Sequence, residues 1–308
     1  MRVRLKTILC TTDFSDYSNQ TIAYGAAIAA EFGAQLLVCH VIDLQFAAIY
    51  GTVHFLPPDL QTQSIETTIE RIKTLMEGSR VTWEPVVSTG PPADRIAGIV
   101  AERSVDLVIA ATRGRTGLKR FLLGSVTERL MRSLTCPLLV VRDIPPELRP
   151  DPSMGLRFKK VFVGCDFSPA SNAALEYGLG LAQEFESELH LVHVIEPQVY
   201  SDFVAASLSE DREAGNDIKV RLDQRLASLV PVEVMNWCRV KTAVIAGRPF
   251  EAITDYAGEK NIDLVVLGVR GHGVVETLFL GSTTDRVIRK VQCPVLSVNP
   301  PQPDDTLK

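Results

Sequence analysis

No apolar run in this sequence approaches the ~18–20 residues that a membrane-spanning helix needs. The basic start of the chain is followed only by a short apolar run, Thr7 to Cys10, whereas the apolar core of a secretory signal is about 7–15 residues long. The sequence therefore predicts a cytoplasmic protein that does not insert into membranes.

An excess of basic residues is also missing. The 308-residue chain has a net charge of −5, with 32 Lys and Arg against 37 Asp and Glu. Residues 1–146 carry 15 basic and 14 acidic side chains, and the remaining residues carry 17 and 23. Because proteins that bind nucleic acids or anionic membranes usually present a basic surface, neither half is predicted to bind them.

Paired cysteines are absent as well. The six cysteines include no CxxC pair, and several stand inside apolar runs such as TILC and LLVC. In a chain without an export signal, such cysteines behave as small buried hydrophobic residues. Neither a disulfide framework nor a structural zinc site is predicted.

Common catalytic signatures are missing too. There is no GxxxxGK[ST] phosphate loop, no complete GxGxxG and no GxSxG nucleophile turn. His190 and His193 could suggest a metal pair, but residues i and i+3 of a strand point to opposite faces, which favours core or strand-end roles. Asp106 and Asp263 precede apolar runs and are interpreted as turn or capping residues rather than catalytic acids.

What the sequence does contain is an internal duplication. TTDFSDYSNQTIAYGAAIAAEFGAQLLVCHVID resembles GCDFSPASNAALEYGLGLAQEFESELHLVHVIE, and SVDLVIAATRGRTGLKRFLLGSVTERLMRSLTCPLLVV resembles NIDLVVLGVRGHGVVETLFLGSTTDRVIRKVQCPVLSV. The offset is 153 residues at Asp13 and Asp166 and 157 residues at Gly124 and Gly281, so four extra residues enter the second copy. The proline-rich, charged segment RDIPPELRPDPSMGLRFKK lies between the copies and is predicted to be a linker.

Each copy alternates strand-like and helix-like segments. In the first copy the predicted strands are Ile8–Thr12, Gln35–Ile42, Val81–Val87, Leu107–Ala111 and Leu138–Val141. The predicted helices are Asn19–Phe32, Leu60–Met76, the segment after Gly90 and Ser125–Leu134. Near-continuous Val, Ile and Leu in the strands predict a parallel sheet covered on both faces. Right-handed crossovers then make an α/β protein of two tandem doubly wound domains, residues 1–146 and 156–302, each with five strands.

A glycine-rich loop follows the fourth predicted strand of each copy. In the second copy it reads Gly268-Val-Arg-Gly271, then nine residues, then Gly281-Ser282. Glycine lets backbone N–H groups approach an anion, and the start of the following helix favours negative charge. The loop therefore indicates a phosphate site at the carboxyl edge of the sheet. One such loop alone could equally be a turn with an N-cap, but the pattern recurs in both copies.

Asp13 and Asp166 end the first predicted strand of their copies, at the same edge. Two roles remain open for them, contact with a ligand and an Asx-type cap of the following turn. A carboxylate at this place could also hold a divalent cation such as Mg²⁺ beside the phosphates.

Together these residues resemble the universal stress protein family. The resemblance rests on the spacing of the glycine loop, the strand-terminal Asp and the last strand after CPVL, and it covers both halves, as in a tandem member. It implies an adenine-nucleotide alpha hydrolase-like fold, and many members of the family bind ATP, although others lack the motif and bind none. Adenine would lie against the Asp and the valine of the second strand, and the phosphates would lie in the glycine loop. The implied residues are Asp13, Val41, Ala110, Ala111, Gly114, Gly124 and Ser125 in the first copy, and Asp166, Val194, Leu267, Gly268, Gly271, Gly281 and Ser282 in the second.

The first copy departs from the motif at Ala111, which replaces the first glycine. Its methyl group occupies space where the backbone should approach the ligand, and alanine disfavours positive φ if that is required. The basic residues near the two loops are Arg113, Arg115, Lys119 and Arg120 in the first copy, and Arg270 with His272 in the second. Because exposed charges add only modest, salt-screened energy, the second copy is predicted to be the surer site.

Two long segments follow the second predicted strands, Asp43–Ser64 and Glu196–Gly215. Their aromatic residues and histidine are Phe46, Tyr50, His54, Phe55, Tyr200 and Phe203. Loops of this length often carry function, and these could cover either the nucleotide or a partner surface.

The sequence thus predicts a nucleotide-binding regulatory protein that uses bound ATP to control an unidentified protein partner or its own assembly. The halves are expected to pack as a pseudo-dimer through Leu138–Val141 and Val295–Val298, and homodimerisation is also expected. Two alternatives remain open. One is a slow ATPase or phosphotransferase that uses Asp13 or Asp166 with a metal, and the other is a scaffold or a sensor of another small ligand.

Overall fold

The chain forms two compact units. In the computed structural model, the first unit is Arg4–Leu156 and the second is Arg157–Lys308 together with Met1–Val3. The structure describes residues 3–43, 58–112, 123–142, 156–196, 212–269 and 281–300. The positions singled out above at Gly114, Gly271, the neighbouring basic residues and the aromatic residues of the two long segments lie outside the described residues.

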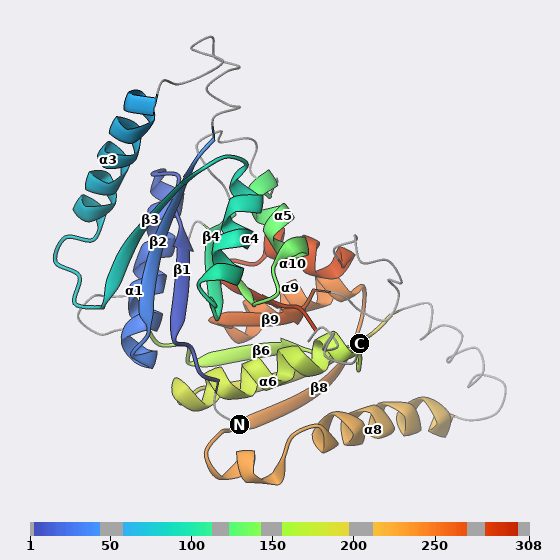
Figure 1. Cartoon of the computed structure of the whole chain (residues 1–308). Helices are drawn as coiled ribbons and strands as arrows, with labels where there is room; N and C mark the ends of the chain where they lie inside the picture. The colour runs from blue at the N-terminus through green and yellow to red at the C-terminus, as the bar shows by residue number, and fades with distance from the viewer. Residues whose placement is uncertain are drawn as a thin grey trace, which may run out of the picture. The chain divides into compact units, whose positions relative to one another are not determined.

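The described elements of the first unit alternate along the chain (Figure 1). They are β1 (Thr7–Thr11), α1 (Asp16–Phe32), β2 (Gln35–Ile42), α3 (Pro58–Leu75), β3 (Trp83–Thr89), α4 (Pro92–Glu102), β4 (Leu107–Ala111), α5 (Ser125–Ser133) and β5 (Leu138–Val141). The strands pair in parallel in the order β3-β2-β1-β4-β5. Helices α4 and α5 pack against each other, while α1 packs on β1, β2 and β4.

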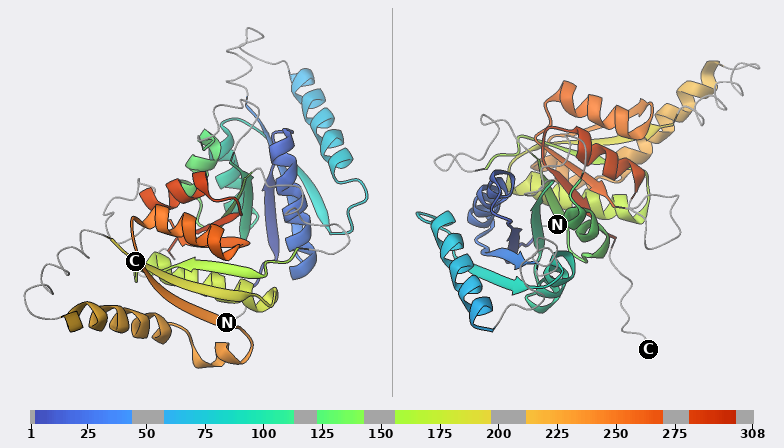
Figure 2. Two further views of the ribbon diagram at one scale, coloured as in Figure 1. Left: turned by 180° about the vertical axis from the view of Figure 1, so that it is seen from behind. Right: turned by 90° about the horizontal axis from the view of Figure 1, so that it is seen from above.

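The second unit repeats this arrangement (Figure 2). Its elements are β6 (Lys160–Gly164), α6 (Pro169–Glu184), β7 (Glu188–Ile195), α8 (Arg212–Ser228), the 3-10 helix η2 (Val232–Asn236), β8 (Val240–Ala246), α9 (Pro249–Lys260), β9 (Leu264–Gly268), α10 (Ser282–Lys290) and β10 (Val295–Val298). The parallel order is β8-β7-β6-β9-β10. The predicted α/β class, with a five-stranded parallel sheet and flanking helices in each copy, is confirmed.

The strand cores follow the apolar pattern of the sequence. Ile8, Leu9, Leu36 and Leu37 have 0% exposed surface, as expected for strands that helices cover on both faces. Helix α1 approaches the sheet closely at Gly25, where a Cβ would collide with the sulfur of Cys10. The small residues of this helix therefore set the distance between helix and sheet.

Two boundaries differ instructively from the sequence prediction. Helix α1 begins at Asp16, three residues before the predicted Asn19, because the Ser15 side chain accepts a hydrogen bond from the Ser18 N–H and caps a polar first turn. Most of the extra residues of the second copy fall between α8 and β8. Eleven residues (229–239) connect these elements and include η2, whereas seven residues (76–82) connect α3 and β3.

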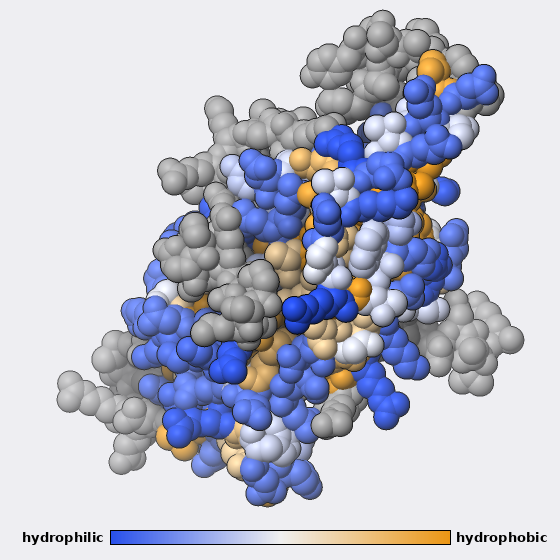
Figure 3. Space-filling view, turned by 90° about the vertical axis from the view of Figure 1, so that its left-hand side faces the viewer, coloured by the Kyte–Doolittle hydropathy of each residue, from blue (hydrophilic) through white to orange (hydrophobic). Residues whose placement is uncertain are grey.

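Hydrophilic residues predominate on the face drawn in Figure 3, and hydrophobic residues appear there in small separate groups. The large hydrophobic side chains that are exposed in the described part of the chain are Leu60, Val220, Val232 and Met235. None of the helices in the described ranges is long and apolar enough to cross a membrane.

Candidate functional site

The strand order of each unit defines where a ligand would bind. The chain leaves β1 toward β2 on one side, while β4 pairs with β1 on the other side. In doubly wound sheets the loops after two such strands diverge and leave a crevice at their carboxyl ends. Asp13 follows β1 and Ala111 ends β4, so both belong to this switch point. Asp166 after β6 and Gly268 at the end of β9 occupy the same places in the second unit.

Asp13 shapes the turn between β1 and α1. Its Oδ1 accepts hydrogen bonds from the Ser15 backbone N–H at 3.0 Å and from the Ser15 hydroxyl at 2.6 Å. In the second unit Asp166 Oδ1 accepts from the Ser168 N–H at 3.0 Å, and Ser168 caps α6. The predicted Asx-type turn is therefore present in both units. The half-buried carboxylates remain at the edge of the sheet where the sequence placed a ligand.

The base of each glycine-rich loop is closed by two hydrogen bonds. The Gly124 N–H donates to the Thr112 carbonyl at 2.8 Å, and the Thr127 hydroxyl donates to the Ala111 carbonyl at 2.7 Å. In the second unit the Gly281 N–H donates to the Val269 carbonyl at 2.9 Å, and Thr284 donates to the Gly268 carbonyl at 2.8 Å. These bonds hold the first turns of α5 and α10 at the ends of β4 and β9.

Helices α5 and α10 begin at glycine rather than at a capping side chain. Gly124 and Gly281 are the N-cap residues, with no side-chain cap hydrogen bond, and Ser125 and Ser282 are exposed first residues of the helices. The sequence left open a turn with an N-cap at this place, and the structure assigns the N-cap of α10 to Gly281. The first N–H groups of an α-helix have no partner within the helix, so these helix starts suit an anion.

Gly268 has a packing role that the sequence did not indicate. A Cβ at this position would lie 2.8 Å from the carbonyl carbon and Cβ of Ala170 in the first turn of α6. The glycine therefore lets α6 approach the end of β9. At the matching position of the first unit, the methyl group of Ala111 is accommodated at 8% exposure.

The remaining predicted residues line the same edge. Val41 near the end of β2 is 9% exposed, Ala110 is 2% exposed and Leu267 is 4% exposed. Val194 in β7 is half-buried and pairs with Ile245 of β8. Buried side chains leave the backbone of these strands as the part that a ligand could contact.

Three side chains beside Asp13 were not singled out from the sequence. The guanidinium carbon of Arg71 lies 4.0 Å from the ring centroid of Phe14, and the Phe14 and His40 ring centroids are 4.7 Å apart. His40 Nδ1 donates to the Thr12 carbonyl at 2.7 Å. We call this group the Arg–Phe–His stack of the first unit.

The second unit has the same stack. Arg225 lies 4.0 Å from the Phe167 centroid, Phe167 and His193 are 4.8 Å apart, and His193 Nδ1 donates to the Cys165 carbonyl at 2.8 Å. The repeated D-F-S and H-V sequences carried a signal for Phe and His. The arginines, at an offset of 154 residues, lie outside the stretches whose similarity is plain.

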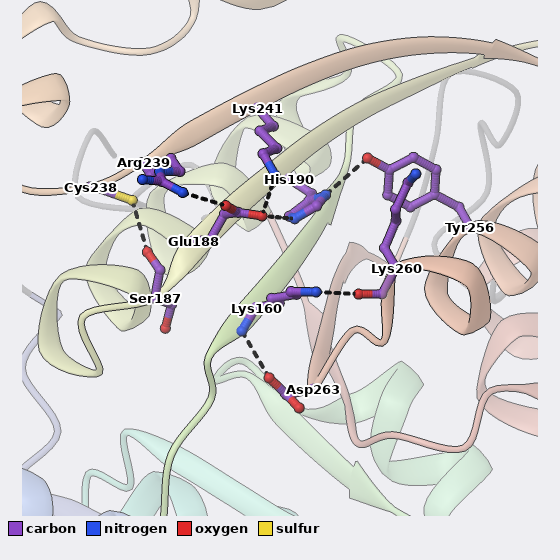
Figure 4. Close-up of polar contacts among 10 residues, drawn as sticks. All are labelled: Lys160, Ser187, Glu188, His190, Cys238, Arg239, Lys241, Tyr256, Lys260 and Asp263. Carbon is purple, nitrogen blue, oxygen red and sulfur yellow. Dashed lines mark hydrogen bonds and ion pairs between the residues drawn. The ribbon is translucent and has the colours of Figure 1, made fainter.

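A polar cluster lies at the opposite end of β7 (Figure 4). His190, with a side chain that is 2% exposed, places Nε2 2.8 Å from Glu188 Oε1 and Nδ1 2.9 Å from the Tyr256 hydroxyl. Lys241 Nζ also lies 2.8 Å from Glu188 Oε1. Burial lowers the pKa of His190 although Glu188 favours its charged form. Both ring nitrogens of His190 are used, so this cluster serves the packing of the second unit.

Asp106 before β4 and Asp263 before β9 each lie at the amino edge of the sheet of their own unit. Asp106 Oδ2 accepts from the Lys6 and Thr7 N–H groups at 2.7 and 2.9 Å, and Asp263 Oδ2 accepts from the Lys160 N–H at 2.9 Å. They tie the starts of neighbouring strands together, far along the strands from Asp13 and Asp166. Among the described residues there is no group of three or more His, Cys, Asp or Glu suited to a metal ion.

The cysteines offer no reactive thiol. All six are free, and five of them are buried. Burial raises the pKa of the Cys39 thiol to about 12 and that of Cys136 to about 12, so both stay protonated at neutral pH. This agrees with their predicted role as small apolar residues.

Comparison with known proteins places both units in one family. The sequence pattern of the universal stress protein family matches residues 4–142 and 157–299. Universal stress protein Slr1230 of Synechocystis sp. is 24% identical over 320 residues, which cover 95% of this chain and 99% of that protein. Universal stress protein MJ0531 of Methanocaldococcus jannaschii is 32% identical over 139 residues, or 44% of this chain and 82% of that protein.

A solved structure of a relative has the same fold along the whole chain. A universal stress protein from Archaeoglobus fulgidus superposes with a TM-score of 0.67 at 23% identity. The match covers 96% of this chain and 97% of that protein. Another universal stress protein was solved in complex with cAMP, and it matches 46% of this chain with a TM-score of 0.34. With the family pattern present twice and full-length tandem relatives alongside, the chain belongs to the universal stress protein family as a two-domain member.

Proposed function

We propose that this protein binds ATP at the carboxyl edge of each sheet and acts as a regulator rather than as an efficient enzyme. One observation carries the proposal: in both units the Asp after the first strand and an uncapped helix start after the fourth strand belong to adjacent strands. The first would meet adenine and the second would meet the phosphates, as the resemblance to the family implies. Mg²⁺ would be held by Asp13 or Asp166 together with the phosphates.

The neighbouring helix starts are less suitable for this role. Helices α4 and α9 also lack a side-chain cap, but they follow β3 and β8, which are two strands away from β1 and β6. Among the described elements, an Asp after one strand and a glycine-started helix after the adjacent strand therefore occur together only at the switch points. This favours ATP over a ligand that would use the outer part of the sheet.

The test is calorimetry of the purified full chain with ATP, with and without Mg²⁺, and with cAMP as a second ligand. Binding of ATP that is weakened by Gly281→Val supports the proposal. Absence of heat in the wild-type protein would instead favour the scaffold or the sensor of another ligand. Mass spectrometry of the natively purified protein gives an independent readout, because a bound nucleotide would be carried through mild purification.

A slow ATPase or phosphotransferase is the second candidate. The carboxylates of Asp13 and Asp166 favour it, since either could hold a metal beside the phosphates. Substantial turnover that Asp166→Ala abolishes would establish the enzyme and overturn the binding-only proposal.

The cellular setting belongs to the same proposal. Six free cysteines suit the reducing cytoplasm. We propose that the bound nucleotide controls an unidentified protein partner or the assembly of the chain into a homodimer, while the two halves of one chain pack as a pseudo-dimer through β5 and β10. Size measurement with and without ATP tests the assembly part.

A further inference from the structure

The Arg–Phe–His stack surrounds a backbone conformation that a phenylalanine adopts only when its surroundings hold it. Phe14 has φ 64° and Phe167 has φ 62°, both in the left-handed region. Bulky side chains rarely occur there, and such residues cluster at functional sites because the surrounding structure must stabilise them. The same outlier at the same place in both units points to a shared purpose.

The position of the phenylalanine explains what this conformation controls. Phe167 stands between Asp166, whose Oδ1 accepts from the Ser168 N–H, and Ser168, which caps α6. Its φ angle therefore sets the direction of the carboxylate relative to the helix. The histidine supports one side of the ring and is itself fixed by the hydrogen bond from Nδ1 to the Cys165 carbonyl.

The arginine supports the ring from an outer helix. Arg225 belongs to α8 and Arg71 belongs to α3, and both helices follow the segments that leave β7 and β2. Each arginine precedes a residue with 0% exposure, Leu226 or Ile72, so its backbone is anchored while its side chain stays exposed. A guanidinium over an aromatic face is attracted by the ring electrons. The contact thus links an outer helix to the turn that carries the aspartate.

We propose that Arg71 and Arg225 are positioning residues of the two nucleotide sites, each acting through the phenylalanine ring to hold the Asp–Phe–Ser turn and present its carboxylate. Helices α3 and α8 are thereby coupled to the state of the site. This inference rests on the proposed binding of nucleotide, but its effect on the turn exists without ligand.

A double-mutant cycle on the full chain tests the role in binding. Arg225→Gln should weaken ATP binding at the second-unit site about 2- to 5-fold, the range expected from a partly exposed cation–π contact. Arg225→Lys should restore part of the loss. Lys219→Gln, which removes the same charge from an exposed place on α8, should leave affinity unchanged. In a Phe167→Leu background, Arg225→Gln should cause no further loss.

The cycle separates positioning from direct contact with the ligand. The inference is wrong if Arg225→Gln lowers the affinity for ATP as much in the Phe167→Leu background as in the wild type, and if this loss of affinity becomes smaller in high salt. In that case Arg225 contacts the phosphates itself. Equal effects of Arg225→Gln and Lys219→Gln would also overturn it. Thermal denaturation of each variant verifies that the protein is folded.

Hydrogen exchange in the ligand-free protein supplies the readout that does not depend on nucleotide. The Ser168 amide should exchange about 2- to 5-fold faster in Arg225→Gln than in Lys219→Gln, because its bond to Asp166 loosens with the turn. Unchanged exchange would overturn the positioning role. If the wild type binds no ATP while exchange responds as expected, the proposed function fails and the control of the turn stands.

Discussion

At the scale of single residues, Gly268 lies where the end of β9 meets the first turn of α6, at the edge of the sheet where a ligand is proposed to bind. The missing Cβ lets the first turn of α6 reach the strand end, since a methyl group there would lie 2.8 Å from Ala170. We expect Gly268→Ala to lower the free energy of unfolding of the second unit by about 1–3 kcal/mol, as overpacking does. Urea unfolding measured by circular dichroism checks this.

A matched glycine provides the control. Gly258 lies inside α9 with nothing within 4 Å of the place where its Cβ would be. Gly258→Ala should leave stability unchanged or raise it by up to about 1 kcal/mol, since alanine favours helix more than glycine does. A Gly268→Ala protein as stable as Gly258→Ala would show that α6 moves away at no cost.

Asp166 is predicted to have two separable roles. Asp166→Asn keeps an oxygen that can accept from the Ser168 N–H, so the melting temperature should stay within about 1–2 °C of the wild type. Affinity for ATP should fall, because the carboxylate charge is lost at the proposed adenine edge. Asp166→Ala should lower both the melting temperature and the affinity. Calorimetry that finds full affinity in Asp166→Asn would assign this residue to the turn alone.

Sequence reasoning reached the turn and the glycine loops because their chemistry is local. Aspartate followed by serine, or glycine before a helix, has the same physical meaning in any context. Arg225 and Arg71 could not be found in this way, since their partners lie far away in sequence and meet them only after β1, β2 and the outer helix assemble. Gly268 was predicted as part of a phosphate-binding loop, whereas the structure shows that it also makes room for Ala170 of α6.

At the scale of elements, periodicity predicted every strand end of the first copy to within two residues, and it predicted both ends correctly for three strands, Leu138–Val141 among them. Gln35–Ile42 and Leu107–Ala111 were predicted as observed, since continuous apolar runs mark buried parallel strands. The start of α1 was missed because a capped first turn is polar and carries no hydrophobic period. The helix after the first long segment was predicted to begin at Leu60 and begins at Pro58, while the second long segment was predicted to extend to Gly215 and α8 begins at Arg212.

The polar cluster of β7 should make the second unit sensitive to acid. Burial keeps the pKa of His190 below its ordinary value of 6.5, so the unfolded state binds this proton first as the pH falls below 6.5. Stability is therefore lost on acidification through this range. The double variant His190→Leu/Tyr256→Phe removes the titrating group without leaving a tyrosine hydroxyl that has lost its partner, and it should flatten the loss between about pH 6.5 and 5.

Glu188 provides a second range of pH for comparison. Its pKa is lowered, chiefly by the hydrogen bond from Lys241, so its stabilising contribution is present above its ordinary value of 4.5 and is lost as the pH falls below that value. Lys241→Gln should therefore change the profile below about pH 4.5, and because the Lys241 charge also lowers the pKa of His190, it should reduce the loss of stability in the upper range as well. If urea midpoints of His190→Leu/Tyr256→Phe follow the wild-type slope down to pH 5, His190 does not cause the acid sensitivity.

At the scale of the whole molecule, duplication gives one chain two candidate sites that share their arrangement of elements and differ in single residues. Both have the strand-terminal aspartate, the closed loop base and the stack, while the first residue of the glycine motif is Ala111 in one and Gly268 in the other. The methyl group of Ala111 requires a wider separation between the strand end and the neighbouring helix than Gly268 does. The second site should therefore close more tightly around a ligand.

Substitutions in one unit at a time test this difference within the intact chain. Gly124 and Gly281 begin α5 and α10, so a valine at either place adds a branched side chain beside the proposed phosphates of one site only. We expect two ATP sites in the wild type, loss of the tighter one in Gly281→Val, loss of the weaker one in Gly124→Val, and no binding in the double variant. Calorimetric stoichiometry and affinity distinguish these cases. Equal losses, or a larger loss in Gly124→Val, would contradict a tighter second site and would fit a larger contribution from the basic residues of the first loop than from the methyl group of Ala111.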